Sequence, residues 1–198
     1  LLGALVGDAA GATLEFLGRT PNPDEVRGAM TLPGGGYWRV APGQITDDGE
    51  LALSLARGLA GDDTYREDRV AAQYVRWFNS KPFDIGHATT CAFSHDLDEY
   101  EEHPWITSAV LEAARHHNLE SKANGSLMRC MPLAIWGYCL SDEELAALAR
   151  QDSLYSHPNP SCCDAVACYV IAMATLIRTQ GDADAAFEQA LAAGCQVI

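Results

Sequence analysis

The chain has 198 residues, with 13 Lys and Arg against 27 Asp and Glu, and a formal net charge of −14. Such an acidic surface cannot neutralise nucleic-acid phosphates, so the charge argues against DNA, RNA and anionic membranes as partners. Hydrophobic residues make up 48% of the chain and charged residues 20%, which is typical of a globular domain that buries its own core. The seven cysteines are an odd number without zinc-like spacing, and they predict reduced thiols in a cytoplasmic protein.

Apolar residues recur at three- and four-residue steps, as in Leu51, Leu55 and Leu59, which is the period of an α-helix. The alternating β-branched runs that would predict a sheet are few. The spacing predicts helices over 2–17, 48–60, 63–79, 87–99, 105–117, 127–139, 142–151, 162–179 and 183–193. Longer loops are expected at 18–46, 80–87, 118–126 and 153–161. We therefore expect an all-α, compact, single-domain helical bundle.

The first segment, residues 1–17, is apolar but lacks a basic flank and is interrupted by Asp8 and Glu15. It predicts a helix rather than a membrane span, because a charge at the bilayer centre is costly. On that helix the two acids, seven residues apart, would lie on nearly one face. Asp8 at the polar edge of a packed helix is one interpretation. Glu15 would end the helix, where an acid opposes the helix dipole, and this suggests a functional role for it.

Thr46, Asp47 and Asp48 precede an apolar helical run. A hydroxyl and two adjacent carboxylates in one short segment supply the hard oxygen ligands that Mg²⁺ or Ca²⁺ requires. The alternative is helix capping, with Thr46 or Asp47 as the N-cap and Glu50 completing a capping box.

Three later turns carry further candidates. Asp84 lies in a Pro-Phe-Asp-Ile-Gly turn, where it could accept from a cationic group or simply cap a helix, and Gly86 permits close backbone approach to a ligand. The turn that starts with Asn124 is expected to open a helix, whose N–H groups could hold phosphate, although Asn-Gly is also a common turn. His157 lies in a Pro-rich loop, where it could contact a ribose or base or be a surface residue.

The order of the motifs is more specific than any one of them. GDAAGATLE, GQITDDGELALSLA, PFDIGHATT, NGSLMRCMPLA and SHPNP follow one another along the chain. Together they resemble the ADP-ribosylglycohydrolase family, especially its bacterial dinitrogenase-reductase-activating branch. The resemblance implies an all-helical protein that hydrolyses the N- or O-glycosidic bond between ADP-ribose and an acceptor, using two Mg²⁺ or Mn²⁺ ions.

Matching the motifs position by position assigns a role to each candidate. Thr46, Asp47 and Asp48 would be metal ligands. Glu15 would be the carboxylate beside the scissile bond, and Asp84 would face the acceptor, in the arginine-specific branch its guanidinium. Gly125, Ser126 and His157 would line the ADP-ribose cleft, with Asn124 and Met128 beside them. Gly86, which permits close backbone approach, is a further candidate for substrate binding.

Two positions depart from the family pattern. Gly49 stands where the family usually has a hydroxyl residue, so a backbone or water contact is expected in its place. The second acidic motif of the family is missing, and the Gly-Asp-Ala-Asp-Ala run at 181–185 is not assigned to it. The domain, 1–198, is therefore expected to be incomplete at both ends, and a chain that ended at Ile198 would be inactive.

The sequence thus predicts a Mg²⁺-dependent hydrolase that removes ADP-ribose from a modified protein side chain, arginine in the first instance. An O-linked or free ADP-ribose derivative is the alternative substrate. A catalytically inactive, ADP-ribose-binding or crystallin-like relative is the alternative class. We expect a cytoplasmic monomer whose partner is an ADP-ribosylated protein or an ADP-ribose derivative, with neither nucleic acid nor membrane involved.

Overall fold

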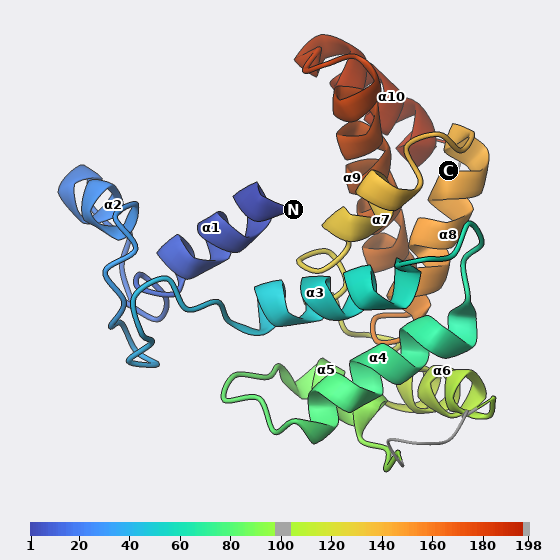
Figure 1. The fold of residues 1–198 in the computed structure, drawn as a ribbon, viewed down its shortest axis with the longest axis horizontal. Coiled ribbons are helices and arrows are strands. Elements are labelled where there is room, and N and C mark those ends of the chain that lie inside the picture. Colours follow the sequence, from blue (N-terminus) through green and yellow to red (C-terminus); the bar gives the residue numbers. More distant parts are fainter. Residues whose placement is uncertain (98–103, 196–198) are drawn as a thin grey trace. The chain divides into compact units, whose positions relative to one another are not determined.

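The computed structural model describes residues 1–97 and 104–195. These residues form ten α-helices and no β-strand, with one isolated bridge between Gly35 and Val40. The all-α prediction is confirmed. Figure 1 labels the helices, whose bounds are α1 Leu2–Gly11, α2 Pro23–Ala29, α3 Asp47–Leu59, α4 Glu67–Asn79, α5 His87–Phe93, α6 Ile106–His117, α7 Met131–Trp136, α8 Asp142–Leu154, α9 Pro160–Arg178 and α10 Ala183–Cys195.

The chain divides into two compact units, Leu1–Glu50 and Leu51–Ile198. The boundary falls inside α3, so this helix begins in the first unit and continues in the second. Each unit is described by itself.

In the first unit, α1 ends at Gly11 rather than at residue 17. The Thr13 hydroxyl donates to the carbonyl of Ala10, and the chain then continues through tight turns to Phe16, whose φ is +56°. Short polar side chains that bond to nearby carbonyls compete with helix propagation. The expectation that Asp8 and Glu15 share a helix face is therefore wrong, because Glu15 lies in the turn after the helix.

The segment 18–46 contains a helix, α2, where a continuous loop was expected. Asn22 caps it by accepting from the backbone N–H groups of Asp24 and Glu25, while Glu25 accepts from the backbone of Asn22. Pro23 occupies the first turn, where its missing N–H costs nothing. The sequence carried a full capping box, but the helix has only seven residues and too little apolar periodicity to be detected.

A glycine run connects α2 to the segment before α3. Gly34, Gly35 and Gly36 all have positive φ. A Cβ atom on Gly36 would lie 2.6 Å from the carbonyl oxygen of Ala12. The run therefore packs directly against the chain that leaves α1, which only glycine allows.

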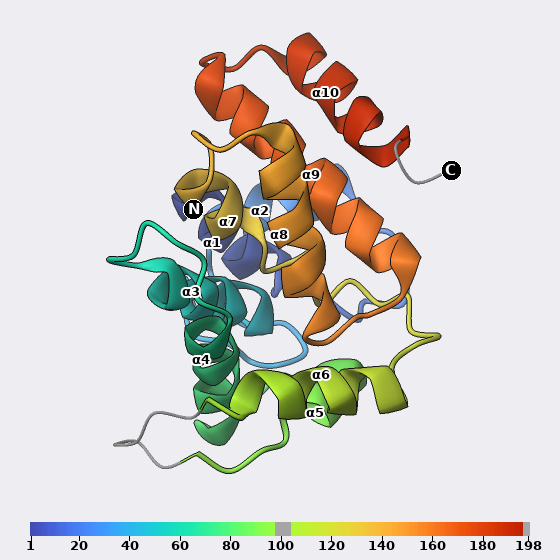
Figure 2. The ribbon, with the colours of Figure 1, turned by 90° about the vertical axis from the view of Figure 1, so that its right-hand side faces the viewer.

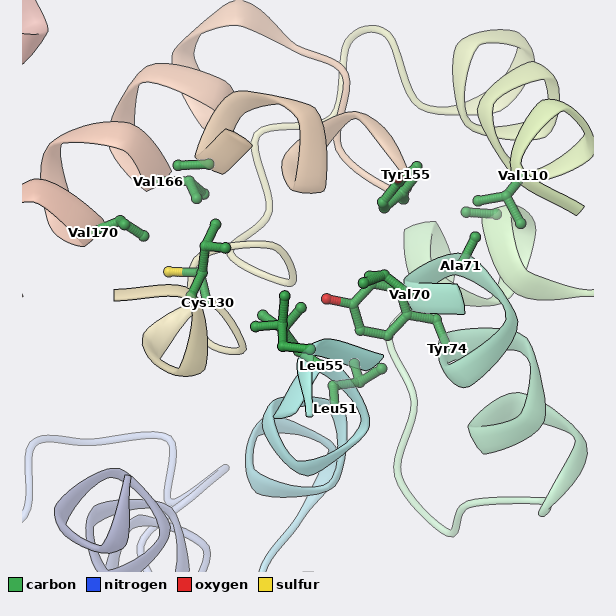
Figure 3. Packing of buried hydrophobic residues seen from close by; sticks show 14 of the residues in the cluster. Leu51, Leu55, Val70, Ala71, Tyr74, Val110, Cys130, Tyr155, Val166 and Val170 are labelled. Atoms are coloured by element: carbon green, nitrogen blue, oxygen red, sulfur yellow. The ribbon is translucent and has the colours of Figure 1, made fainter. Parts of the chain in front are cut away.

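The second unit contains the main hydrophobic core (Figure 3). Leu51 and Leu55 of α3 lie beside Val70 and Tyr74 of α4, and all four side chains are fully buried. Burying a leucine side chain of this kind contributes about 2 kcal/mol. Residues from α5 to α9 complete the cluster, which fixes the loops that leave these helices.

Helix α9 packs along α8 and α10 (Figure 2). Among the described helices it alone is long and apolar enough to cross a membrane, judged by length and composition. Its residues Val166, Val170 and Ile171 are fully buried in the main hydrophobic core. This burial accounts for the apolar composition of α9.

In the second unit, too, predicted helices are shorter than expected, and the one over 63–79 begins only at Glu67. The helix expected over 87–99 ends at Phe93; residues 98 and 99 lie outside the described part of the chain. The helix expected over 127–139 is α7, six residues long, with Pro132 in its first turn. Residues 125–129 form turns instead, so the prediction that the Asn-Gly turn opens directly into a helix is wrong.

Candidate active site

In the first unit, Asp8 of α1 joins the segment that precedes α3. Its Oδ2 atom accepts from the backbone N–H groups of Thr46 and Gly49, both at 2.9 Å, and its Oδ1 atom accepts from the Thr46 hydroxyl at 2.7 Å. Thr46 is only 3% exposed. Three donors to one carboxylate hold the start of α3 in a fixed position on α1.

This arrangement changes how the first turn of α3 is capped. In most helices the N-cap side chain accepts a hydrogen bond from the N–H group three residues later, which here belongs to Gly49. In this protein the Gly49 N–H donates to Asp8 instead. The Thr46 hydroxyl donates to Asp8 rather than accepting from the helix. The interpretation of Thr46 as a self-contained N-cap is therefore wrong, and sequence reasoning missed the role of Asp8, 38 residues away.

Gly49, the residue that departs from the family pattern, fits this contact. A Cβ atom there would lie 2.6 Å from Asp8 Oδ2 and 2.9 Å from Ile45 Cβ. A side chain at this position would displace the Asp8 carboxylate. The Gly49 backbone N–H donates to Asp8.

Asp47 and Asp48 occupy the first turn of α3, where acids favour the helix dipole, and both are half-buried. With the Thr46 oxygen they form a set of three oxygen donors from consecutive residues. Because the Thr46 proton is donated to Asp8, the lone pairs of its oxygen remain for a cation. Mg²⁺ is held by one or two carboxylates and retains several waters, so this donor set fits one such ion.

A complete protein-built metal cage is not present in the described residues. They include no group of three or more His, Cys, Asp or Glu side chains that could hold a metal ion. The candidate set therefore depends on the threonine oxygen and on water or substrate ligands.

Glu15 lies exposed in the turn after α1. The next residue, Phe16, packs against Tyr37 of the glycine-rich loop, with ring centroids 4.9 Å apart. A non-glycine residue with positive φ is held only where its surroundings determine it, and such residues cluster at functional sites. The position of Glu15 thus comes from this turn and not from a helix end.

In the second unit, Asp84 lies half-buried in the segment between α4 and α5. The N-cap of α5 is Gly86, so the interpretation of Asp84 as an ordinary N-cap is wrong. Gly86 is exposed, and among the described residues the atom nearest to a Cβ built there is the Thr89 hydroxyl oxygen at 3.9 Å.

The turn at 124–126 and His157 come together in the second unit. Gly125 and Ser126 are buried, and His157 is only 1% exposed. A Cβ atom on Gly125 would lie 2.6 Å from His157 Cε1, so the glycine lets the turn approach the imidazole edge. Ser153 Oγ lies 2.9 Å from Ser126 Oγ and 3.0 Å from the His157 carbonyl. The interpretation of His157 as a surface residue is therefore wrong.

The two remaining candidates of this turn, Asn124 and Met128, are less buried than Gly125 and Ser126. Asn124 is exposed and Met128 is half-buried against the core. A cavity of about 140 Å³ lies beside this turn, lined by Asn124, Ser126, Leu127 and the start of α9. It is smaller than a typical ligand pocket, so it would take only a fragment of a nucleotide-sized ligand.

Sequence reasoning missed Arg129, which organises this region. Its guanidinium is fully buried and pairs with Asp152, from Nε to Oδ2 at 3.2 Å. It also donates to the carbonyl of Gly125 at 3.1 Å and to the Ser156 hydroxyl at 2.6 Å. The sequence does contain a signal for this role, because Arg129 stands inside the apolar run Leu-Met-Arg-Cys-Met. An arginine in such a run is expected to be buried, and a buried arginine requires a paired acid.

The acid that balances Arg129 is itself fully hydrogen bonded. Asp152 accepts from the Tyr74 hydroxyl at 2.7 Å, and the Tyr74 ring lies 4.4 Å from the guanidinium carbon. This pairing satisfies a buried charge on both sides. Burial, with a smaller contribution from the positive charge of Arg129, lowers the pKa of His157 to about 4. His157 is therefore neutral at physiological pH.

The structure thus groups the candidates in two sets, each within one unit. Thr46, Asp47 and Asp48 adjoin one another at the start of α3, and Glu15 lies elsewhere in the same unit. Gly125, Ser126 and His157 are in one buried cluster of the second unit, whose other candidates are Asp84, Gly86, Asn124 and Met128.

Comparisons with known proteins agree with these motifs. A family model described as ADP-ribosylglycohydrolase matches residues 1–197. The chain is 34% identical over 159 residues to the ADP-ribosyl-[dinitrogen reductase] glycohydrolase of Rhodospirillum rubrum, covering 79% of this chain and 50% of that protein. It is 32% identical over 143 residues to the ADP-ribosylarginine hydrolase Tri1 of Pseudomonas putida (strain GB-1), covering 69% and 34%.

A solved structure, described as an ADP-ribosylglycohydrolase-related protein complex, matches with a TM-score of 0.66 and 29% identity. The match covers 89% of this chain and 54% of that one. The chain spans half or less of the length of these two curated relatives. From the family match over nearly all residues and from the relatives, we conclude that the chain belongs to the ADP-ribosylglycohydrolase family.

Proposed function

We propose that this chain takes part in the Mg²⁺-dependent hydrolysis of the glycosidic bond between ADP-ribose and a modified arginine side chain. The observation that carries the proposal is the buried cluster of Gly125, Ser126 and neutral His157. The names of two relatives support the substrate class, since one acts on ADP-ribosyl-dinitrogen reductase and the other is an ADP-ribosylarginine hydrolase.

The second unit would bind the ADP-ribose part. Lysine and arginine are few in this chain, and Lys122 lines the cavity beside the turn, so a pyrophosphate would be held by neutral donors with one nearby cation. The turn at 124–126 offers backbone N–H groups and the Ser126 hydroxyl, and Gly125 lets the turn lie directly against the His157 ring. Asp84 would face the guanidinium of the acceptor, because a carboxylate and a guanidinium form a charge-assisted pair.

The first unit would supply the reacting carboxylates. Thr46, Asp47 and Asp48 would hold Mg²⁺ or Mn²⁺, which acts as a Lewis acid toward ribose and water oxygens when bound. Asp8 keeps this segment in place through its three hydrogen bonds. Glu15, exposed in the turn after α1, would take a proton from the attacking water.

One observation favours a second candidate, an ADP-ribose-binding relative without turnover. The described part of the chain has no group of three side chains that would hold a metal by itself. A protein with only Thr46, Asp47 and Asp48 as donors could bind ADP-ribose and leave the glycosidic bond intact.

The test measures release and binding separately. The full-length protein that contains this chain is incubated with an ADP-ribosyl-arginine peptide and saturating Mg²⁺, free ADP-ribose is followed by chromatography, and ADP-ribose binding is measured by calorimetry. Release that falls at least about a hundredfold in Glu15→Gln supports hydrolysis with Glu15 as proton acceptor. Binding without release supports the second candidate. Neither binding nor release would overturn both.

A serine-linked peptide and free O-acyl ADP-ribose serve as competing substrates in the same assay. Faster release from either would assign an O-linked acceptor in place of arginine. Asp24→Ala is the matched control for Glu15→Gln, since Asp24 is an exposed acid of the same unit. It should leave both release and binding unchanged.

A further inference from the structure

The imidazole of His157 ends a short hydrogen-bonded chain that starts at a buried guanidinium. Arg129 donates from Nη1 to Ser156 Oγ at 2.6 Å, and Ser156 Oγ lies 2.9 Å from His157 Nδ1. Arg129 and Ser156 are both 0% exposed. Water therefore does not compete for these contacts.

The direction of each hydrogen bond follows from the chemistry of the groups. A guanidinium has donors only, so Ser156 Oγ must accept from Arg129. The hydroxyl proton of Ser156 then needs an acceptor, and among the described contacts the one open to it is His157 Nδ1. A proton on Nδ1 would leave the buried Ser156 proton without an acceptor, which is unfavourable.

The opposite edge of the ring faces the turn. A Cβ atom on Gly125 would lie 2.6 Å from Cε1 and 3.2 Å from Nε2 of His157. Within the described residues, the hydrogen bonds of the His157 side chain involve Nδ1, and Nε2 has no protein partner. Because His157 is 1% exposed, an acceptor for Nε2 must come from a group that reaches the ring beside this turn.

We infer that Arg129 and Ser156 are positioning residues that hold His157 as the Nε2–H tautomer, so that the ring offers a neutral donor to an oxygen acceptor of the ligand. Phosphoryl and hydroxyl oxygens are the acceptors of this class. The inference rests on the proposed function only where it names ADP-ribose as that ligand. The low pKa of His157 agrees with it, because an imidazolium would carry protons on both nitrogens.

The first test needs neither a substitution nor a ligand. In the ¹⁵N-labelled wild-type protein at pH 7, long-range ¹H–¹⁵N spectra show which ring nitrogen of His157 carries the proton. We expect Nε2 to be protonated and Nδ1 to be bare. A proton on Nδ1, or a mixture of the two tautomers, would overturn the inference.

The second test removes the orienting hydroxyl. In Ser156→Ala, Nδ1 loses its donor, so we expect the Nδ1–H form to become populated and the Kd for ADP-ribose to rise about fivefold, the loss of one hydrogen bond. Ser153→Ala is the matched control, because Ser153 lies in the same buried cluster but contacts the His157 carbonyl rather than its ring. It should keep the Nε2–H form.

The outcomes separate this inference from the proposed function. An Nε2–H ring in a protein that does not bind ADP-ribose would support the positioning role and overturn the proposed ligand. Binding that is unchanged in Ser156→Ala, despite a changed tautomer, would overturn the claim that the ligand uses the Nε2 donor. An unchanged tautomer in a folded Ser156→Ala protein would overturn the role of Ser156.

Discussion

The Asp8 carboxylate accepts from both the backbone N–H and the hydroxyl of Thr46, at 2.9 and 2.7 Å. Asp8 lies in α1, and Thr46 immediately precedes α3. The same carboxylate takes the Gly49 N–H at 2.9 Å. The Asp8 side chain therefore accepts hydrogen bonds from two backbone N–H groups at the start of α3. It also orients the Thr46 hydroxyl, which adjoins the two candidate metal ligands Asp47 and Asp48.

Asp8→Asn should destabilise the first unit. The amide keeps one oxygen for the two N–H groups but carries no negative charge, and its NH₂ can only donate, so the Thr46 hydroxyl must accept where it now donates. Losing a hydrogen bond to a charged acceptor costs about 2 kcal/mol, so the free energy of local unfolding should fall by this amount. Hydrogen exchange of the Gly49 amide measures it directly.

Asp24→Asn is the control for this change. Asp24 is an exposed acid in α2 of the same unit, paired with Arg27, and exposed ion pairs contribute little. Its effect on Gly49 exchange should be negligible. Equal exchange rates in the two variants would show that the Asp8 contacts do not stabilise the start of α3.

Asp47→Ala/Asp48→Ala should remove Mg²⁺ or Mn²⁺ binding. Each substitution deletes a carboxylate, and the remaining Thr46 oxygen is too weak a ligand to hold a hard cation alone. Calorimetric titration of the metal measures the effect, with Asp24→Ala as the control. Equal affinity in the double variant and the wild type would leave Asp47 and Asp48 as acids that only favour the helix dipole.

Sequence periodicity predicted the helical class and the position of most helices, because buried faces such as Leu51, Leu55 and Leu59 repeat at the helical period. Periodicity did not predict the helix ends that are determined by local hydrogen bonds. Thr13 helps to end α1 at a turn, and Asn22 starts α2 within an apparent loop. The end of α1 and the start of α2 each depend on one or two side chains. A periodicity measured over many residues does not detect such single side chains.

The candidate site was predicted from motifs, one segment at a time. That approach identified Thr46 and His157 but could not identify their partners. Asp8 contacts Thr46 across 38 positions, and Arg129 contacts Ser156 across 27. Such pairs are fixed by packing of the whole unit, and a single sequence contains no signal that pairs them.

Asp84→Asn should impair cleavage of an arginine-linked substrate more than that of an O-linked one. The carboxylate would form a charge-assisted pair with the guanidinium, and the amide cannot replace that pair. We expect kcat/KM for the ADP-ribosyl-arginine peptide to fall about tenfold or more, the equivalent of roughly 1.5 kcal/mol. Steady-state kinetics on both substrates checks this, and an equal loss on the two would remove Asp84 from the acceptor side.

Acid should destabilise the second unit through His157. Its pKa is lowered from 6.5 to about 4 in the folded protein, so between these values the unfolded chain binds a proton that the folded chain does not. The free energy of unfolding therefore falls as pH drops from 6.5 to about 4, and the His157 contribution is constant above and below this window. Between pH 7 and pH 4.5 the loss is about 2 to 3 kcal/mol.

Urea unfolding at these two pH values isolates this contribution when the wild type is compared with His157→Gln. Glutamine does not titrate, whereas the carboxylates of the two proteins are the same and cancel in the difference. The variant should be less stable at pH 7 but lose about 2 to 3 kcal/mol less than the wild type on going to pH 4.5. Parallel losses in the two proteins would mean that the folded state accepts a proton on His157 as readily as the unfolded chain does. The ring would then not be held in the neutral form by burial beside Arg129.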